Sequence, residues 1–282
     1  MSRTADLESI AFAAGLKPAI RRTVDPSELD AVEAQLRAPG VVVLRARRTA
    51  RLGAREQAVL YVARTAEHAG ALRDAEEAVL PGASGAPDAR ERHREVGRLL
   101  GFPPCCVEAF LARLDRGVDR LDARGPGGLA EDYVAARSAW VPRPDARVNP
   151  LLMAVRAQLV SFYPCRYDCP EAVGVAEALR AVLERRQPAA AAALLALLSR
   201  PVAIAPDGAR ALLVLGGALD GAVIARAVAP RRSDAKSDPR DVALADTLVG
   251  ASVAPDGALG SGEGAFPIWC VDFSARAAAE VR

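Results

Sequence analysis

The stretch GFPPCC, which begins at Gly101, constrains the fold of this chain more than any other feature. Gly101 can adopt the left-handed conformation that closes a helix, and Pro103 cannot continue one. Pro104 suits the first position of a new helix, because its missing N–H group needs no partner there. The sequence therefore predicts two helices joined by a short connection, with Cys105 and Cys106 in the first turn of the second helix.

The two adjacent cysteines are expected to differ in direction. Successive residues of a helix point about 100° apart, so the two sulfurs should diverge. Cys106 should lie beside the apolar stripe that contains Val107, Phe110 and Leu111, and Cys105 should turn toward the flank of the helix. The positive end of a helix dipole and its amide groups stabilise a thiolate at this position. With regular helix geometry, this pair would supply one thiolate ligand to a metal ion, and it would supply a second only if the turn is irregular.

A second phrase, FYPCRYDCPEAV at residues 162–173, repeats the combination of proline and cysteine. Asn149 and Pro150 are predicted to begin a helix that ends before this phrase. The apolar stripe of that helix would consist of Leu152, Val155, Leu159 and Phe162. Cys165 should then lie in a loop, and Cys169 should take the N-cap position of a further helix.

The rest of the chain predicts an α+β fold with three parts. The small N-terminal α/β part, residues 1–87, should contain buried strands at 41–46 and 58–64 and helices at 27–37 and 65–80. The helical middle, residues 88–199, carries the four cysteines of the two phrases. Its helices should begin near Asp88, Pro104, Gly128, Asn149, Pro170 and Pro188.

The C-terminal part, residues 200–282, is predicted to form an antiparallel sheet. Short apolar runs there are separated by Asp-Gly dipeptides at 207–208 and 220–221, which favour tight hairpins. The run PIWCVDF at 267–273 should be the last strand. Cys270 alternates within this strand and is expected to be a core residue.

Composition excludes several classes of protein. The chain has 282 residues, 51% of them apolar and 26% charged, which is the balance of a soluble globular protein. A net charge of +2 gives no long-range attraction for nucleic acid. No apolar run approaches the roughly 18 residues of a membrane span, and Asp6 and Glu8 interrupt any signal-peptide pattern. We therefore expect a cytoplasmic protein with no membrane partner and with other partners undefined.

The number and clustering of the cysteines limit the kinds of chemistry expected of this chain. In a reducing cytoplasm, clustered cysteines favour metal binding or redox chemistry over structural disulfides. The chain has five cysteines, so one stands outside any paired scheme. It has no nucleotide-binding motif and no hydrolase motif.

The segment GRLLGFPPCCVEAF, followed by NPLL and then SFYPCRYDCPEA, resembles a prokaryotic family of unknown function. A G-F/Y-P-x-C-C phrase and a later P-C-x-x-x-C phrase mark that family. The resemblance covers about residues 93–173 and leaves the C-terminal sheet aside. It implies that Cys105, Cys106, Cys165 and Cys169 belong together, and it supplies no reaction.

Three interpretations of these four cysteines remain open. The first is a metal-binding protein in which the four thiolates hold an iron–sulfur cluster, with zinc as the near alternative. Iron is slightly preferred because Phe162, Tyr163 and Tyr167 would shield a cluster. The second is a thiol-based redox enzyme that uses the helix-start cysteines. The third is that the cysteines are small residues that fill helix junctions. Whether the protein is an enzyme stays undecided.

Other candidate residues carry weaker signals. His93 and Glu95 could approach the cysteines as ligand or base, but solvated helix positions are expected for both. An arginine cluster could bind phosphate, yet it lacks interleaved aromatics and is expected to be an ordinary charged surface. The cluster consists of Arg45, Arg47, Arg48, Arg51 and Arg55.

Overall fold

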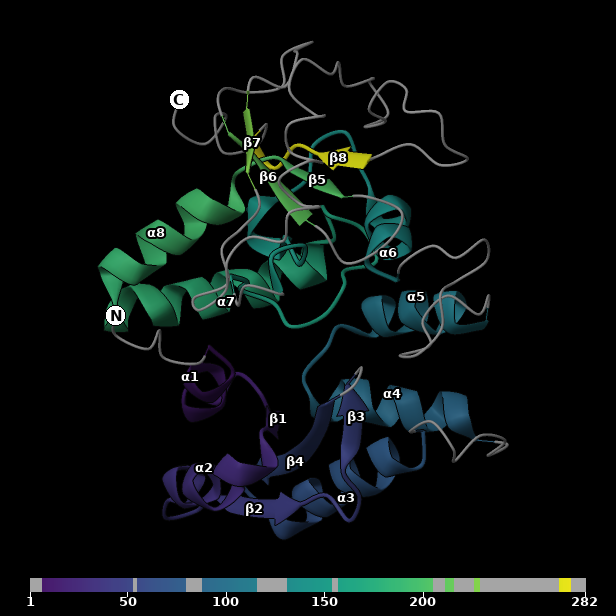
Figure 1. The fold of residues 1–282 in the computed structure, drawn as a ribbon, viewed down its shortest axis with the longest axis vertical. Helices are drawn as coiled ribbons and strands as arrows, with labels where there is room; N and C mark the ends of the chain where they lie inside the picture. Colours follow the sequence, from purple (N-terminus) through teal and green to yellow (C-terminus); the bar gives the residue numbers. More distant parts are fainter. Residues whose placement is uncertain are drawn as a thin grey trace. The chain divides into compact units, whose positions relative to one another are not determined.

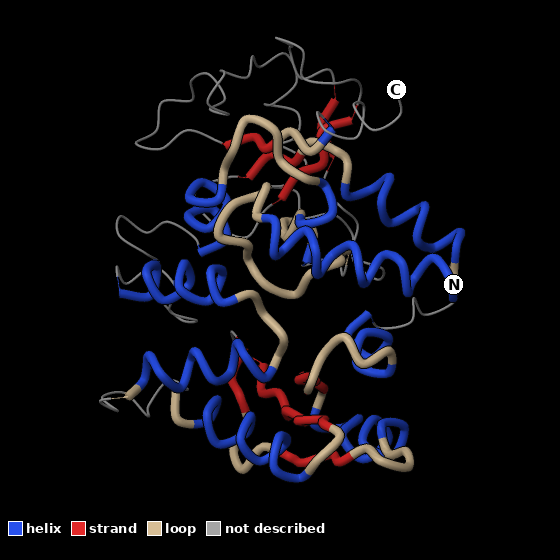
Figure 2. Tube along the Cα trace, turned by 180° about the vertical axis from the view of Figure 1, so that it is seen from behind, coloured by secondary structure: helices blue, strands red, loops and turns tan. Residues whose placement is uncertain are grey.

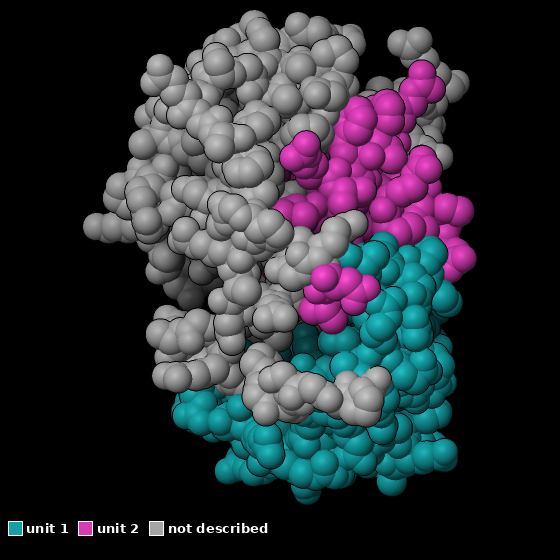
Figure 3. Space-filling view, turned by 90° about the vertical axis from the view of Figure 1, so that its right-hand side faces the viewer, with its two compact units in different colours: residues 1–112 teal, residues 113–282 magenta. Residues whose placement is uncertain are grey.

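The computed structural model describes eight stretches of the chain. These are residues 7–52, 55–79, 88–115, 131–153, 157–204, 211–215, 226–228 and 269–274. The chain divides into two compact units, residues 1–112 and residues 113–282, which are coloured separately in Figure 3. Helices and antiparallel strands occur in both units, so the predicted α+β class is confirmed (Figure 1).

The first unit is built on an antiparallel sheet. Its strands are β1 (Ala19–Val24), β2 (Val42–Arg45), β3 (Ala50–Leu52) and β4 (Arg55–Ala63). The order is β1-β4-β2, with β3 also paired to β4, so β4 is the central strand. The run from Ala58 to Ala63 is buried along its whole length, as expected for an apolar strand covered on both faces. The predicted strand at 41–46 is only half-buried, because β2 has a strand on one side only.

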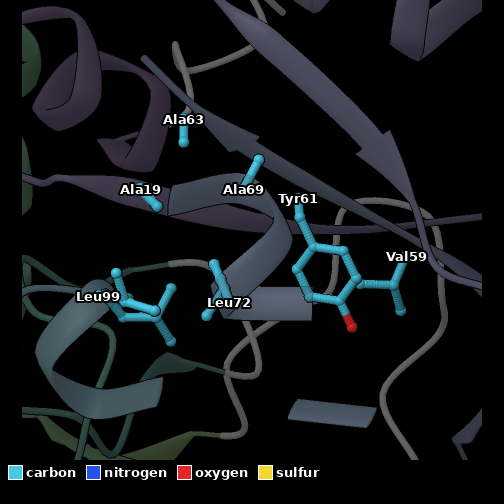
Figure 4. Packing of buried hydrophobic residues seen from close by; sticks show 8 residues of the cluster. Ala19, Val59, Tyr61, Ala63, Ala69, Leu72 and Leu99 are labelled. Carbon is cyan, nitrogen blue, oxygen red and sulfur yellow. The ribbon is translucent and has the colours of Figure 1, made fainter. Parts of the chain in front are cut away.

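Helices cover the sheet on both faces. They are α1 (Leu7–Ala13), the short 3-10 turn η1 (Pro26–Glu28), α2 (Leu29–Leu36), α3 (Ala66–Glu77) and α4 (Ala89–Leu99). The helix α5 (Pro104–Asp115) follows α4 along the chain. On one face Tyr61 packs with Leu72 of α3 and Leu99 of α4 (Figure 4). On the other face Ile20 and Val62 pack with residues of α1 and α2. The core of this unit therefore reaches the end of α4, directly before the first cysteine pair.

The second unit carries the later helices and a second sheet. Its helices are α6 (Glu131–Ala139), the 3-10 turn η3 (Ala146–Val148), α7 (Pro170–Arg186) and α8 (Pro188–Leu198). Its strands are β5 (Val202–Ile204), β6 (Ala211–Leu215), β7 (Arg226–Val228) and β8 (Trp269–Val271). They pair in the antiparallel order β7-β6-β5-β8. Figure 2 shows the strands of both sheets in red. The predicted C-terminal antiparallel sheet is present. The two Asp-Gly turns lie outside the described residues.

The predicted helix beginning at Asn149 is wrong. Asn149 Oδ1 accepts a hydrogen bond from the Leu151 N–H at 3.0 Å, and its amide donates to the Leu198 carbonyl at 2.9 Å. The bond to the Leu151 N–H is the one that a helix N-cap would make, but the described residues that follow, before α7, form turns, a 3-10 position and irregular chain, and no α-helix. Leu152, Leu159 and Phe162 of the expected stripe are nevertheless buried, in turns and irregular chain, and Val155 lies outside the described residues.

The expected three-part division stays a prediction. In the structure α4 contacts α3 within the first unit. None of the helices in the described ranges is long and apolar enough to cross a membrane.

Candidate metal centre

The connection between α4 and α5 forms as the sequence predicts. Gly101 has a φ of 72°, and its N–H donates to the Arg98 carbonyl at 3.1 Å. The N–H of Phe102 donates to the Gly97 carbonyl at 2.8 Å. This pair of bonds is the Schellman arrangement, which satisfies the last carbonyls of a helix. The Lys17 ammonium lies 5.3 Å from the centre of the Phe102 ring, so the connection is also anchored from the side.

The first cysteine pair follows directly at the start of α5. Cys106 is buried and Cys105 is half-buried, as the predicted directions require. The expected divergence of the sulfurs is wrong, because the two Sγ atoms are 3.9 Å apart. The first turn of a helix has no preceding turn to restrict its side chains, so both thiols can swing toward one point. Adjacent Cα atoms lie about 3.8 Å apart, below the usual disulfide range, so this pair is poorly suited to a disulfide.

The second cysteine pair is held in a tight turn before α7. Cys165 lies in a bend and Cys169 is the N-cap residue of α7, as predicted. Between them, the N–H of Tyr167 donates to the Ala139 carbonyl at 2.9 Å, and its carbonyl accepts from the Asp145 N–H at 2.7 Å. The backbone is thus fixed on both sides midway between the two cysteines.

The side chain of Tyr167 adds a further anchor. It is fully buried, and its ring meets Phe273 edge to face with the centroids 5.1 Å apart. The sequence predicts Tyr167 only as a shield for a cluster. Its anchoring role is not predictable from local pattern, because the residues that contact it are more than twenty positions away.

Arg166 places a positive charge beside the second pair. Its guanidinium bonds both oxygens of Asp168 at 2.9 Å. The pKa of Arg166 is raised, mainly by its hydrogen bonds to the Asp168 carboxylate. The charges of Cys165 and Cys169 raise this pKa further. A guanidinium near two sulfurs favours their thiolate form, which is the form that binds metals.

The sulfur atoms of all four cysteines lie within 4.8 Å of one another. They belong to Cys105, Cys106, Cys165 and Cys169, the four residues of the two phrases. Four thiolates at this spacing are a donor set for a soft or borderline metal ion such as zinc or iron. The four therefore form a group that could hold a metal ion. Convergence of all four sulfurs favours metal binding over a redox dithiol, which needs only one pair.

The weaker candidates lie elsewhere. His93 is half-buried, not solvated, because its ring packs edge-on against Phe110 at 5.3 Å between centroids. Glu95 forms a two-pronged ion pair with Arg98, at 2.6 and 2.8 Å. Neither residue belongs to the cysteine group. The side chain of Cys270 lies outside the described part of the structure.

Two of the clustered arginines are paired with carboxylates. Arg45 contacts Asp30 and Glu33, and Arg47 contacts Asp74 and Glu77. The charges of these two arginines are therefore matched by carboxylates. The side chains of Arg51 and Arg55 lie outside the described residues.

The environment of His93 predicts a dependence of stability on pH. Burial lowers the pKa of His93, and the charge of Glu76 opposes this only in part. In the unfolded chain the imidazole has its ordinary pKa near 6.5, so on acidification the unfolded state takes up this proton first. We expect the free energy of unfolding to fall as the pH drops below about 6.5. Denaturant titrations of metal-free protein between pH 7.5 and 5 measure the slope, and His93→Gln should reduce it. An unchanged slope in the variant would refute the assignment.

Comparison with protein-family models, with curated proteins and with solved structures finds no match for this chain. The resemblance to the family with the two cysteine phrases therefore stays a prediction.

Proposed function

We propose that the protein binds one zinc ion through Cys105, Cys106, Cys165 and Cys169. Zn–S bonds of about 2.3 Å in a tetrahedron place neighbouring sulfurs about 3.8 Å apart. The four sulfurs lie within 4.8 Å of one another, and the first two are separated by 3.9 Å. This compact spacing is the observation that carries the proposal, because a single ion would require only small closing movements.

An iron–sulfur cluster is the second candidate. The sequence slightly favours it, and the buried rings of Phe162 and Tyr167 are consistent with a shielded site. A cluster distributes its thiolate ligands over two or four irons, so those ligands stand farther apart than around one ion. The observed spacing supports the single ion over the cluster.

A zinc ion with four thiolate ligands has a structural role. Catalytic zinc sites keep one position for water or substrate, whereas a four-cysteine site is closed. The ion would connect two segments of chain that are about 60 residues apart, and closing a loop of that length costs conformational entropy. Since the ligands are brought together only in the folded chain, binding energy becomes folding energy. We therefore propose that zinc stabilises the fold, with Arg166 offsetting part of the negative charge.

Anaerobic purification followed by a visible spectrum and metal analysis tests this proposal. We expect a colourless protein with one zinc ion per chain. Cobalt(II), exchanged for zinc, should give the intense ligand-field bands of a tetrahedral site and strong sulfur-to-metal charge transfer. A brown protein that contains iron and acid-labile sulfide would replace zinc by a cluster. A protein that takes up none of these metals would contradict both assignments.

A further inference from the structure

Gly97, in the last turn of α4, faces Val107 of α5 at very close range. A Cβ atom built on Gly97 would lie 2.4 Å from Val107 Cγ2 and 3.3 Å from Cγ1. Real Cβ contacts do not reach 2.4 Å, so any other residue at position 97 would force the Val107 side chain or one of the two helices to shift. Val107 is itself buried, with 8% of its surface exposed, and cannot simply rotate into solvent.

The rest of the α4–α5 pair is held on both sides of this contact. Before it, the Gly101–Phe102 bonds fix the connection between the helices. After it, Arg94 of α4 bonds Glu108 of α5 at 2.6 Å. The ring of His93 also contacts the ring of Phe110, which lies one helical turn after Cys106. A displacement of Val107 would therefore fall on the first turn of α5, where the cysteines lie.

We infer that Gly97 is a positioning residue for the proposed zinc site. By leaving space for Val107, it lets the first turn of α5 seat against α4 and directs Cys105 and Cys106 to their separation of 3.9 Å. That separation matches the roughly 3.8 Å between neighbouring sulfurs of a tetrahedral thiolate site, so the first pair is spaced as half of such a site. The inference rests on the proposed function, and it assigns Gly97 a role that spacing of the cysteines alone does not reveal.

Cobalt(II) affinity, measured by competition with a chelator, tests this role in three variants, with Val107→Ala alone as a fourth for reference. Gly97→Ala should weaken cobalt binding at least tenfold and alter the ligand-field bands, because the sulfurs of Cys105 and Cys106 would no longer lie at tetrahedral positions around the ion. Adding Val107→Ala removes the methyl groups that the new Cβ would strike, and it should restore both affinity and spectrum. Gly174→Ala, on α7, is the matched control, since a Cβ there meets no atom within 4 Å. It should leave both unchanged.

The outcomes separate this inference from the proposed function. If the wild-type protein binds no cobalt, the proposed function fails. If the wild type binds and Gly97→Ala binds equally well, or Val107→Ala gives no rescue, the positioning role fails. Should Gly97→Ala not fold, the double variant decides. Affinity within threefold of Val107→Ala alone supports the role, and affinity tenfold weaker overturns it. Thermal unfolding of the metal-free proteins separates lost stability from lost metal geometry.

Discussion

Replacing Cys106 or Cys169 by serine should cost the protein its bound zinc. Loss of an outer-shell partner already weakens metal binding about 10–100-fold, and loss of a thiolate ligand should exceed this. Both sulfurs are buried, with 2% and 4% of the residue surface exposed. Water therefore cannot easily occupy the vacated position, and equilibrium competition with a zinc-binding dye should show affinity reduced more than a hundredfold.

The half-exposed cysteines provide an internal comparison. Water can reach positions 105 and 165 more readily, so Cys105→Ser and Cys165→Ser should retain a three-thiolate site of intermediate affinity. Cys270→Ala should leave zinc binding unchanged, because four thiolates already complete a tetrahedral zinc site and Cys270 is expected to be a core residue of the last strand. Equal loss in all five variants would point to general unfolding, and no loss in any of them would remove these cysteines from the site.

Removing zinc should also lower the stability of the fold by a large amount. At free zinc a thousandfold above its dissociation constant, binding adds about 4 kcal/mol to the free energy of unfolding. For a chain of this size that corresponds to a shift of roughly 10 °C in Tm. Calorimetry with added zinc and with excess chelator measures the difference.

The four-serine variant is the control for the effect of the chelator. Its melting temperature should not respond to zinc or to chelator, because it has no thiolate ligands. A wild-type melting temperature that ignores the chelator would show that the ion does not stabilise the fold, even if it binds.

Proline and glycine made the local chain predictable from sequence. Pro104 and Pro170 begin α5 and α7 as expected, because a proline fixes its own φ and needs no hydrogen-bond donor at a helix start. Gly101 closes α4 with a positive φ, which other residues adopt only with strain. These backbone rules act within a few residues, so they placed all four cysteines on their elements correctly.

The features that the sequence does not predict are those in which side-chain packing or contacts with distant residues determine the conformation. Asn149 makes the side-chain bond of a helix N-cap, yet the described residues between it and α7 form no α-helix, and its amide bonds the Leu198 carbonyl 49 positions away. The separation of Cys105 and Cys106 was misjudged because regular helix geometry does not govern the rotamers of a first turn. The contact of Gly97 with Val107 depends on which faces of α4 and α5 meet, and the anchors of Tyr167 lie far along the chain. Such features follow from packing and not from local pattern.

Zinc K-edge X-ray absorption on the purified protein tests the central claim most directly, because it reports the ligands of the ion itself. A single zinc ion held by the four cysteines predicts four sulfur scatterers at about 2.3 Å, with no nitrogen or oxygen ligand and no second metal nearby. Two or fewer sulfurs around the ion, or a neighbouring metal atom at short range, would contradict it.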